Sequence, residues 1–435
     1  MSHGEMSARS APASRRNFLK ASAIASGALL SGIPVARVGA AETRRKFKVA
    51  LIGCGGRGKG AAENFREAIQ YLNQKLNWQL ECEFVATGDF FQGSAEGAGN
   101  GLGVPKERCF GGGDCYRKVL EQNPEIVLMG QPPVFRPLHF EAAIKAGKHV
   151  FFEKPVAVDP EGVRRVLAAG EEAKRKGLGV VAGTQRRHDR GYNERAREVL
   201  GGARGKVVAG RVAWNMGRIF GNTPINPTKP GDLCGGGRWQ LWVEMSGDHI
   251  CEQHVHNIDI ANWFIGTHPV SAGGFGFRAR RIAGNMYDFF SIDFEYPGNV
   301  HVHSMCRQIG DCWDWVGEDF KFERDKPGDW TPPKDPYEEV GYHPNAYVAE
   351  HAHLVWSIVR GEPLNEAQNV AWATGAAILG RESAYTGRRI TWKEMFEDAG
   401  GKFYNLNFKP KAEDFETDNV PMLKDGDIRI PGVPS

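Results

Sequence analysis

The first half of the chain alternates short apolar runs with segments of helical periodicity. Residues 47–52 and 126–129 are largely apolar, as expected of strands that are buried on both faces. Strands are expected at residues 47–52, 83–88, 126–129, 149–152 and 179–183, and helices at 61–75, 116–122, 138–146 and 160–176. This alternation predicts a doubly wound parallel sheet.

The pattern changes after residue 187. Residues 206–215, 274–279, 288–296 and 299–305 are predicted as antiparallel strands, with helices at 251–264, 346–361 and 366–386. Two Gly- and Pro-rich stretches, 217–238 and 326–344, are too long for simple connections and are typical of lids or partner-binding arms.

The expected fold class is therefore α/β, an N-terminal Rossmann doubly wound parallel sheet followed by an α+β domain with a large, mostly antiparallel sheet. The predicted boundaries are 46–187 for the Rossmann domain, 188–395 for the substrate domain and 396–435 for an extended C-terminal tail. The helix at 366–386 is expected to return and pack on the first domain.

The first forty residues follow a different pattern. Arg15-Arg16, with Phe18, Leu19 and Lys20, precedes a weakly apolar stretch and the small residues near Ala40. This order of basic, apolar and cleavage regions predicts a twin-arginine signal peptide over 1–40. The alternative is an ordinary basic N-terminus before an amphipathic helix. With the signal, the expected partner is the twin-arginine export machinery, and the mature protein is expected to be periplasmic or exported, with no membrane attachment after cleavage.

Composition narrows the function classes. A net charge of +3 over 435 residues is too small to indicate a surface that binds nucleic acid. No stretch reaches the roughly 18 charge-free apolar residues of a membrane span.

The turn after the first strand has the spacing of a dinucleotide site, since Gly-x-Gly-x-x-Gly follows a strand and opens a helix. The first glycine permits the tight turn, the second admits the pyrophosphate, and the third allows close helix–strand packing. Asp89, at the end of the second strand, is expected to bind the adenosine ribose and to favour NAD, with NADP kept open because Arg57 could meet a phosphate. The predicted contacts in this region are Gly53, Gly55, Gly56, Arg57, Gly58 and Asp89.

Beyond the turn, the chain resembles the glucose–fructose oxidoreductase / inositol dehydrogenase (Gfo/Idh/MocA) family. The resemblance rests on residues 126–133, 138–139, 146–155, 247–249 and 252–259, and covers about 47–392. It implies further cofactor contacts at Gln131, Pro132, Glu153 and Lys154. In sugar dehydrogenases of this family an Asp-x-x-x-His pair works with the lysine. The matching positions here are Glu252 and His256, with Glu in place of Asp.

The residues themselves suggest the same chemistry. Lys154 follows a core strand at its carboxyl end, where an ammonium can stabilise an alkoxide. His256 is a natural general base. Glu252, His256 and Asp259 are spaced i, i+4 and i+7, which predicts one helix face.

Other side chains are expected to contact a substrate. These are Arg186, Arg187, Asp259, His254 and Trp239. For the arginines an interdomain salt bridge is an equal alternative, and for His249 and His254 the alternative is a structural hydrogen bond. No metal is expected, because His254 and His256 are two positions apart and point to different faces of a helix.

The leading hypothesis is an oxidoreductase that acts on a carbohydrate hydroxyl with NAD, or NADP, tightly bound, because the periplasm holds no free nicotinamide pool. A homo-oligomer is expected. A second hypothesis is an NAD-dependent glycoside hydrolase or lyase that works by transient oxidation and elimination. A third is a non-catalytic protein that keeps NAD as structure.

Overall fold

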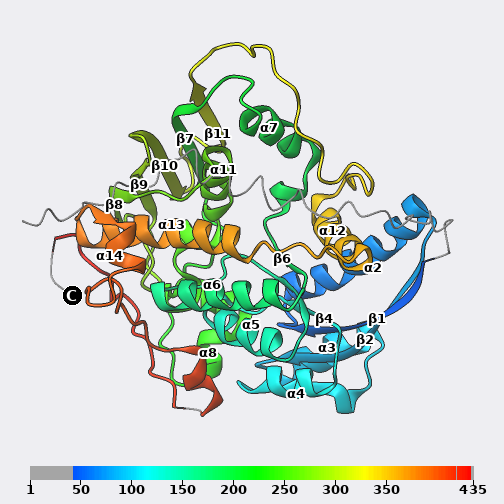
Figure 1. Cartoon of the computed structure of the whole chain (residues 1–435). Coiled ribbons are helices and arrows are strands. Elements are labelled where there is room, and N and C mark those ends of the chain that lie inside the picture. The colour runs from blue at the N-terminus through cyan, green and yellow to red at the C-terminus, as the bar shows by residue number, and fades with distance from the viewer. Residues whose placement is uncertain (1–42, 418, 433–435) are drawn as a thin grey trace, which may run out of the picture. The chain divides into compact units, whose positions relative to one another are not determined.

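Two six-stranded sheets organise the protein in a computed structural model that describes residues 43–417 and 419–432 (Figure 1). The predicted signal peptide at 1–40 lies outside the described residues and stays a prediction.

The first sheet has the strand order β3-β2-β1-β4-β5-β6, and all of its strands are parallel. β4 and β5 are buried on both faces except at His149, which is why their sequences read as uninterrupted apolar runs. The order reverses at β1, so the carboxyl ends of β1 and β4 border the crevice where such sheets bind ligands. The strands are β1 (Arg44–Ile52), β2 (Gln79–Asp89), β3 (Cys109–Gly111), β4 (Ile126–Met129), β5 (His149–Phe152) and β6 (Val180–Ala182). The predicted parallel sheet is confirmed.

Helices connect these strands, and the first begins earlier than its apolar pattern predicts. α2 starts at Gly56, inside the glycine turn, and ends before Asn77, which adopts a left-handed conformation with φ of 53°. The short strand β3 and the helix α3 were not expected, because three residues and a glycine-rich helix carry little periodic signal. The helices are α2 (Gly56–Leu76), α3 (Gln92–Leu102), α4 (Cys115–Glu121), α5 (Arg136–Lys145) and α6 (Pro160–Arg175).

The second sheet has the order β11-β7-β10-β9-β8-β12, and only the β10–β7 pair is parallel. The prediction of a mostly antiparallel sheet is therefore confirmed. In β9 the buried positions are Phe290, Ile292, Phe294 and Tyr296, the period-two pattern of a sheet with one covered face. The strands are β7 (Val207–Met216), β8 (Ser271–Phe277), β9 (Phe289–Tyr296), β10 (Val300–Gln308), β11 (Trp315–Phe322) and β12 (Ile390–Thr391).

The long helix α13 (Ala367–Thr386) lies between the two sheets and packs on α6 and β8 (Figure 1). Its residues are buried on almost every side. α12 (Ala346–Arg360) packs instead on α2, and α7 (Arg190–Leu200) follows the 3₁₀ turn η3 (Gln185–His188). No helix in the described part of the chain has the length and apolarity to cross a membrane.

The single helix predicted at 251–264 is wrong. The chain forms a short helix α10 (His249–Glu252) and then α11 (Val255–Ile265), with Gln253 outside helical geometry at φ −121°. Side chains at the break bond to β10. His254 Nε2 lies 2.7 Å from Ser304 Oγ, and Gln308 Nε2 donates to Gln253 Oε1 at 3.2 Å. Glu252 and His256 thus do not share the face of one continuous helix.

The C-terminal segment, residues 402–417 and 419–432, was expected to be an extended tail. It contains the 3₁₀ helix η5 (Ala412–Glu416), which was not predicted. Phe403, Phe408 and Phe415 are buried along it. Tyr116 donates a 2.7 Å hydrogen bond to Glu416, so this segment is anchored on the Rossmann sheet's helix α4.

Candidate functional site

The glycine turn after β1 leaves no room for a side chain at two of its glycines. Gly53 has a φ of +86°, and a Cβ there would lie 2.1 Å from the backbone nitrogen of Gln131. A Cβ on Gly58 would lie 1.8 Å from the carbonyl oxygen of Gly53. Gly55 and Gly56, in contrast, face open space. The turn therefore packs tightly on one side and leaves its amide groups accessible at the start of α2, as a pyrophosphate requires.

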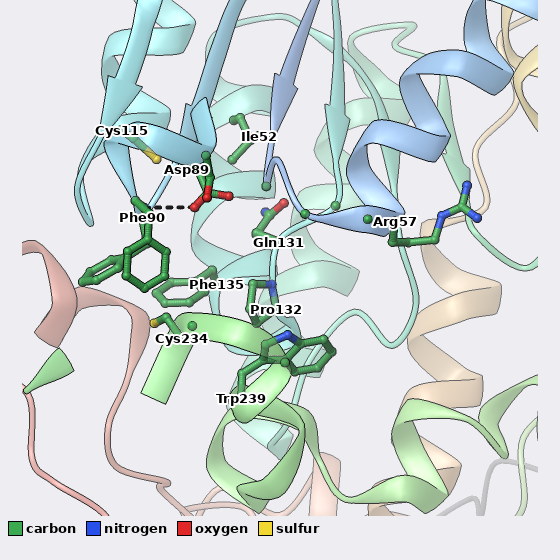
Figure 2. A pocket seen from close by; sticks show the side chains of 18 of the residues that line it. Ile52, Arg57, Asp89, Phe90, Cys115, Gln131, Pro132, Phe135, Cys234 and Trp239 are labelled. Atoms are coloured by element: carbon green, nitrogen blue, oxygen red, sulfur yellow. Dashed lines mark hydrogen bonds between the residues drawn. The ribbon is translucent and has the colours of Figure 1, made fainter. Parts of the chain in front are cut away.

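A cavity of about 450 Å³ opens at this turn. One side consists of the turn and the ends of β2 and β4. The other is residues 230–241, called here the roof, which comprise α8 (Pro230–Cys234) and η4 (Gly235–Leu241). Figure 2 shows Cys234 and Trp239 of the roof facing the strand ends that carry Asp89 and Gln131.

Asp89 stands at the end of β2 on the cavity wall, as predicted. Its carboxylate accepts hydrogen bonds from the backbone of Cys54, at 2.7 Å, and of Phe91, at 2.9 Å. Burial raises the pKa of Asp89, and the two backbone donors oppose that shift. The carboxylate thus joins the turn to the second strand at the place where an adenosine ribose binds in this fold.

The other predicted cofactor residues divide into two groups. Gln131 and Pro132 line the cavity, and the Gln131 amide lies 3.2 Å from Nδ1 of His139. Arg57 also borders the cavity, but its side chain points away from Asp89 (Figure 2). Its Nε is 2.8 Å from Oε1 of the buried Glu153, and its guanidinium lies over the ring of Tyr347.

Lys154 follows β5 by two residues and reaches toward the second half of the chain. Its Nζ donates to the backbone carbonyl of Glu252 at 2.5 Å and lies 3.7 Å from the Glu252 carboxylate. The Lys154–Pro155 peptide bond is cis. Burial raises the pKa of Glu252, and Lys154 acts in the opposite direction.

His256 lies beside this pair on α11. Its Nδ1 is enclosed by protein, and the described residues offer it no hydrogen-bond partner. Its ring stacks on Trp214, with 5.8 Å between centroids. Burial lowers the pKa of His256 well below its usual value, and the positive charges of Lys154 and Arg186 lower it further. The imidazole is therefore neutral, which is the form that accepts a proton.

Three predicted substrate residues are occupied by protein contacts. Arg187 and Asp259 form a buried bidentate ion pair with both distances at 2.8 Å, the interdomain bridge that was the alternative for the arginine. His254 is fully buried on Ser304, and burial lowers its pKa to about 3.

Two others remain near the site. Arg186 lies over Trp214 and pairs with Glu318 of β11 at 2.5 Å. Trp239 belongs to the roof of the cavity at the glycine turn, and Lys154, Glu252 and His256 do not line that cavity.

Sequence reasoning missed Glu318 and most of the roof. Nothing local marks Glu318, because its partners Arg186, Tyr192 and Asn257 come from distant segments. The roof could have been recognised from the three consecutive glycines, Gly235 to Gly237, which lie in the stretch expected to form a lid or arm. Two of them adopt positive φ, at 58° and 75°.

No group of three or more potential ligands in residues 43–417 and 419–432 is arranged to hold a metal ion. The histidine side chains near Glu252 contact different protein groups. His249 packs against Phe290, and His254 bonds to Ser304.

Comparison with known proteins agrees with this geometry. The chain is 26% identical over 198 residues to scyllo-inositol 2-dehydrogenase (NAD(+)) of Bacillus subtilis (strain 168), covering 45% of this chain and 50% of that one. It is 27% identical over 210 residues to 1-carboxy-3-chloro-3,4-dihydroxycyclohexa-1,5-diene dehydrogenase of Comamonas testosteroni, covering 47% and 49%. The chain thus spans about half the length of these curated relatives.

Solved structures share the fold over a longer stretch. Levoglucosan dehydrogenase in complex with NADH and levoglucosan matches with a TM-score of 0.63 at 15% identity, over 80% of this chain and 99% of that one. Residues 47–181 match the family model for the Gfo/Idh/MocA oxidoreductase family with an NAD-binding Rossmann fold. The similarity to this family therefore lies in the Rossmann sheet, from β1 to β6.

Proposed function

We propose that the protein is an NAD-dependent oxidoreductase that acts on a hydroxyl-bearing carbon of a carbohydrate. The observation that carries this proposal is the contact of Lys154 with Glu252, because Glu153, the residue before Lys154, pairs with Arg57 of the glycine turn. His256 follows Glu252 by four residues, and the charge of Lys154 lowers its pKa. The two halves of the chain contribute these residues from separate elements, as a site needs when it brings a substrate to a cofactor.

The cavity fits a nicotinamide dinucleotide. Open space at Gly55 and Gly56, the first amides of a 21-residue helix, and the carboxylate of Asp89 would hold the pyrophosphate and the adenosine ribose. When bound, NAD would supply a hydride acceptor. The negative charge of Asp89 favours NAD over NADP, since a 2′-phosphate would approach it.

The protein's own groups would handle the proton. Lys154, held by the carbonyl and carboxylate of Glu252, would donate a hydrogen bond to the substrate oxygen and stabilise the alkoxide. The neutral imidazole of His256 would accept the hydroxyl proton. Glu252 would act through Lys154, whose ammonium it fixes in place.

We also propose export by the twin-arginine pathway with NAD already bound. The support is the basic and apolar pattern around Arg15 and Arg16, together with a cavity that has protein on both sides. Retention of NAD is tested by denaturing the purified mature protein and identifying the released nucleotide by mass spectrometry. Release of about one NAD per chain is expected, and a preparation without nucleotide contradicts retention but not export.

A conservative double substitution, Arg15→Lys with Arg16→Lys, tests the export route. The precursor should accumulate in the cytoplasm if the twin-arginine route is used. Undiminished appearance of the mature protein outside the cytoplasm would contradict it.

The activity itself is tested by the absorbance of reduced nicotinamide. Cyclitols and sugars are added to purified protein supplied with NAD. Lys154→Met and His256→Asn should each lower kcat by about 10²- to 10⁴-fold. Lys145→Met, an exposed position on α5, is the matched control and should not change it. Equal rates in all four proteins would refute the proposed roles.

The redox-assisted glycosidase is not favoured. That chemistry needs further acid–base groups, but His249 and His254 are buried, and burial lowers the pKa of both. Release of aryl groups from aryl glycosides, lost in Lys154→Met, would reverse this conclusion.

A further inference from the structure

The cluster around His256 contains two positive charges, and each has a carboxylate partner. Lys154 lies 3.7 Å from the Glu252 carboxylate, and Arg186 lies 2.5 Å from the Glu318 carboxylate. Arg186 lies over Trp214, the ring on which His256 stacks, and the charges of Arg186 and Lys154 both lower the pKa of His256. The side chains of Lys154 and Arg186 are 14% and 15% exposed, so both reach the edge of the site.

Glu318 is held more firmly than a surface ion pair would hold it. Its side chain is only 2% exposed. In addition to Arg186, it accepts hydrogen bonds from Asn257 Nδ2, at 2.6 Å, and from the Tyr192 hydroxyl, at 3.1 Å. Three elements, η3, α7 and α11, are thereby joined at one carboxylate of β11. The carboxylate cannot turn away to make room for an anion without breaking all of these bonds.

The cations behind the cluster are also engaged. Arg187 is paired with Asp259, and Arg57 with Glu153. Arg136 is buried, and its Nη1 donates to the carbonyl of Pro155. Each of the five cations named here, Lys154, Arg186, Arg187, Arg57 and Arg136, thus already has a partner in the described part of the chain.

We propose that the site selects uncharged carbohydrates and rejects sugar acids and sugar phosphates, and that Glu318 is the residue that determines this selection by occupying Arg186. The inference rests on the proposed function, because it assumes that a carbohydrate binds beside Lys154 and His256. The hydroxyls of a neutral sugar can form hydrogen bonds with the Lys154–Glu252 and Arg186–Glu318 pairs. An anionic substrate must either displace a carboxylate from its cation or bind beside that carboxylate and be repelled by it.

Binding measurements test this charge selection apart from catalysis. Trp214 stacks on His256 and lies under Arg186, so its fluorescence reports occupancy. Matched pairs such as glucose and glucuronate, or galactose and galacturonate, are titrated into the NAD-loaded protein. Wild type should bind no uronate more tightly than its parent sugar.

Glu318→Gln is the decisive variant, because it frees the guanidinium of Arg186 while keeping the shape of the side chain. Its affinity for uronates relative to the parent sugars should rise roughly tenfold or more, the scale of a charge-assisted bidentate contact. Adding Arg186→Gln should remove that gain. Asp319→Asn is the matched control on the same strand, where Asp319 pairs with Arg211 at the surface, and it should leave the ratio unchanged.

The outcomes separate the two proposals. If folded Glu318→Gln gains no relative affinity for uronates, or if wild type prefers them, the charge selection is wrong. If neutral sugars bind but the nicotinamide is never reduced, the proposed function fails while the selection stands. Should Glu318→Gln not fold, Arg186→Gln gives the reciprocal test. It leaves Glu318 unpaired and should favour glucosamine over glucose by a similar factor, and equal affinities would overturn the proposal.

Discussion

His139 and His254 are enclosed by protein, and burial lowers the pKa of each from 6.5 to about 3. His139 stacks on Tyr116 at 4.3 Å between centroids and contacts the amide of Gln131. His254 bonds to Ser304 at the break between α10 and α11. Both are neutral in the folded protein, and His139 lines the cavity at the glycine turn.

These histidines should make stability depend on pH. The unfolded chain binds a proton at each histidine below pH 6.5, whereas the folded chain does not until about pH 3, so stability falls as the pH drops through that window. From pH 6.5 to pH 5 the loss is about 2 kcal/mol for each histidine.

Urea unfolding of wild type and His254→Asn at pH 7.5 and pH 5 measures this effect. The free energy of unfolding of the variant, relative to that of wild type, should be higher at pH 5 than at pH 7.5. His303→Asn, an exposed position on β10, is the control. A difference that does not change with pH would contradict the assignment.

At the scale of elements, the turn between β1 and α2 contains a position, Gly58, that has no room for a side chain. Gly58 lies in the first turn of α2 and touches the carbonyl of Gly53, while Gly60, two residues on, meets only the flexible end of Arg57 at 3.6 Å. The two glycines are near neighbours on one helix but differ in what surrounds them.

Gly58→Ala should therefore destabilise the protein by about 2 kcal/mol or more, because the turn must move away from the new methyl group. It should also reduce the NAD that copurifies. Gly60→Ala should be neutral or stabilising by about 0.5–1 kcal/mol, since alanine favours the helix. Thermal unfolding and nucleotide content of both variants check this. A Gly58→Ala protein with unchanged nucleotide content would show that the turn tolerates a side chain.

The elements that could be predicted from the sequence are those with local causes. The glycine turn, the apolar strands β4 and β5, and the position of Lys154 after β5 depend on neighbouring residues. The break after Glu252 depends on Ser304 and Gln308, some fifty residues away, so the helical spacing of Glu252 and His256 was misleading. β11 and its Glu318 were missed for the same reason, because their partners lie far away in the chain.

At the scale of the whole molecule, the C-terminal segment supports the wall of the cavity at the glycine turn. Phe415 of η5 packs edge-to-face on Phe135, at 4.9 Å, and on Phe90, at 5.9 Å, and both of these line the cavity. A Cβ on Gly113 would lie 2.1 Å from the carbonyl of Phe415. Further along, Asp425 accepts from the backbone of Ile225, in the loop that precedes the roof.

Phe415→Ala should accordingly speed the release of bound NAD as well as lower stability by about 3–5 kcal/mol. Phe408→Ala is the matched control, since Phe408 is also buried in the same segment but packs on Arg381 and Arg429 instead. It should lower stability without changing release. Stopped-flow fluorescence of NADH displaced by excess NAD measures the rates, and equal rates in both variants would exclude a role for the segment in cofactor retention.

The ion pairs Arg186–Glu318 and Arg187–Asp259 also bear on how such proteins can be recombined. Each arginine belongs to η3, at the end of the Rossmann half, and each acid belongs to the other half. A hybrid joined just after His188 would inherit the arginines from one parent and the acids from the other. If the second parent lacks an acid at position 259, the buried guanidinium loses its partner at a cost of about 3–5 kcal/mol. Exchange of the substrate half between relatives should therefore succeed only when both pairs are transplanted together.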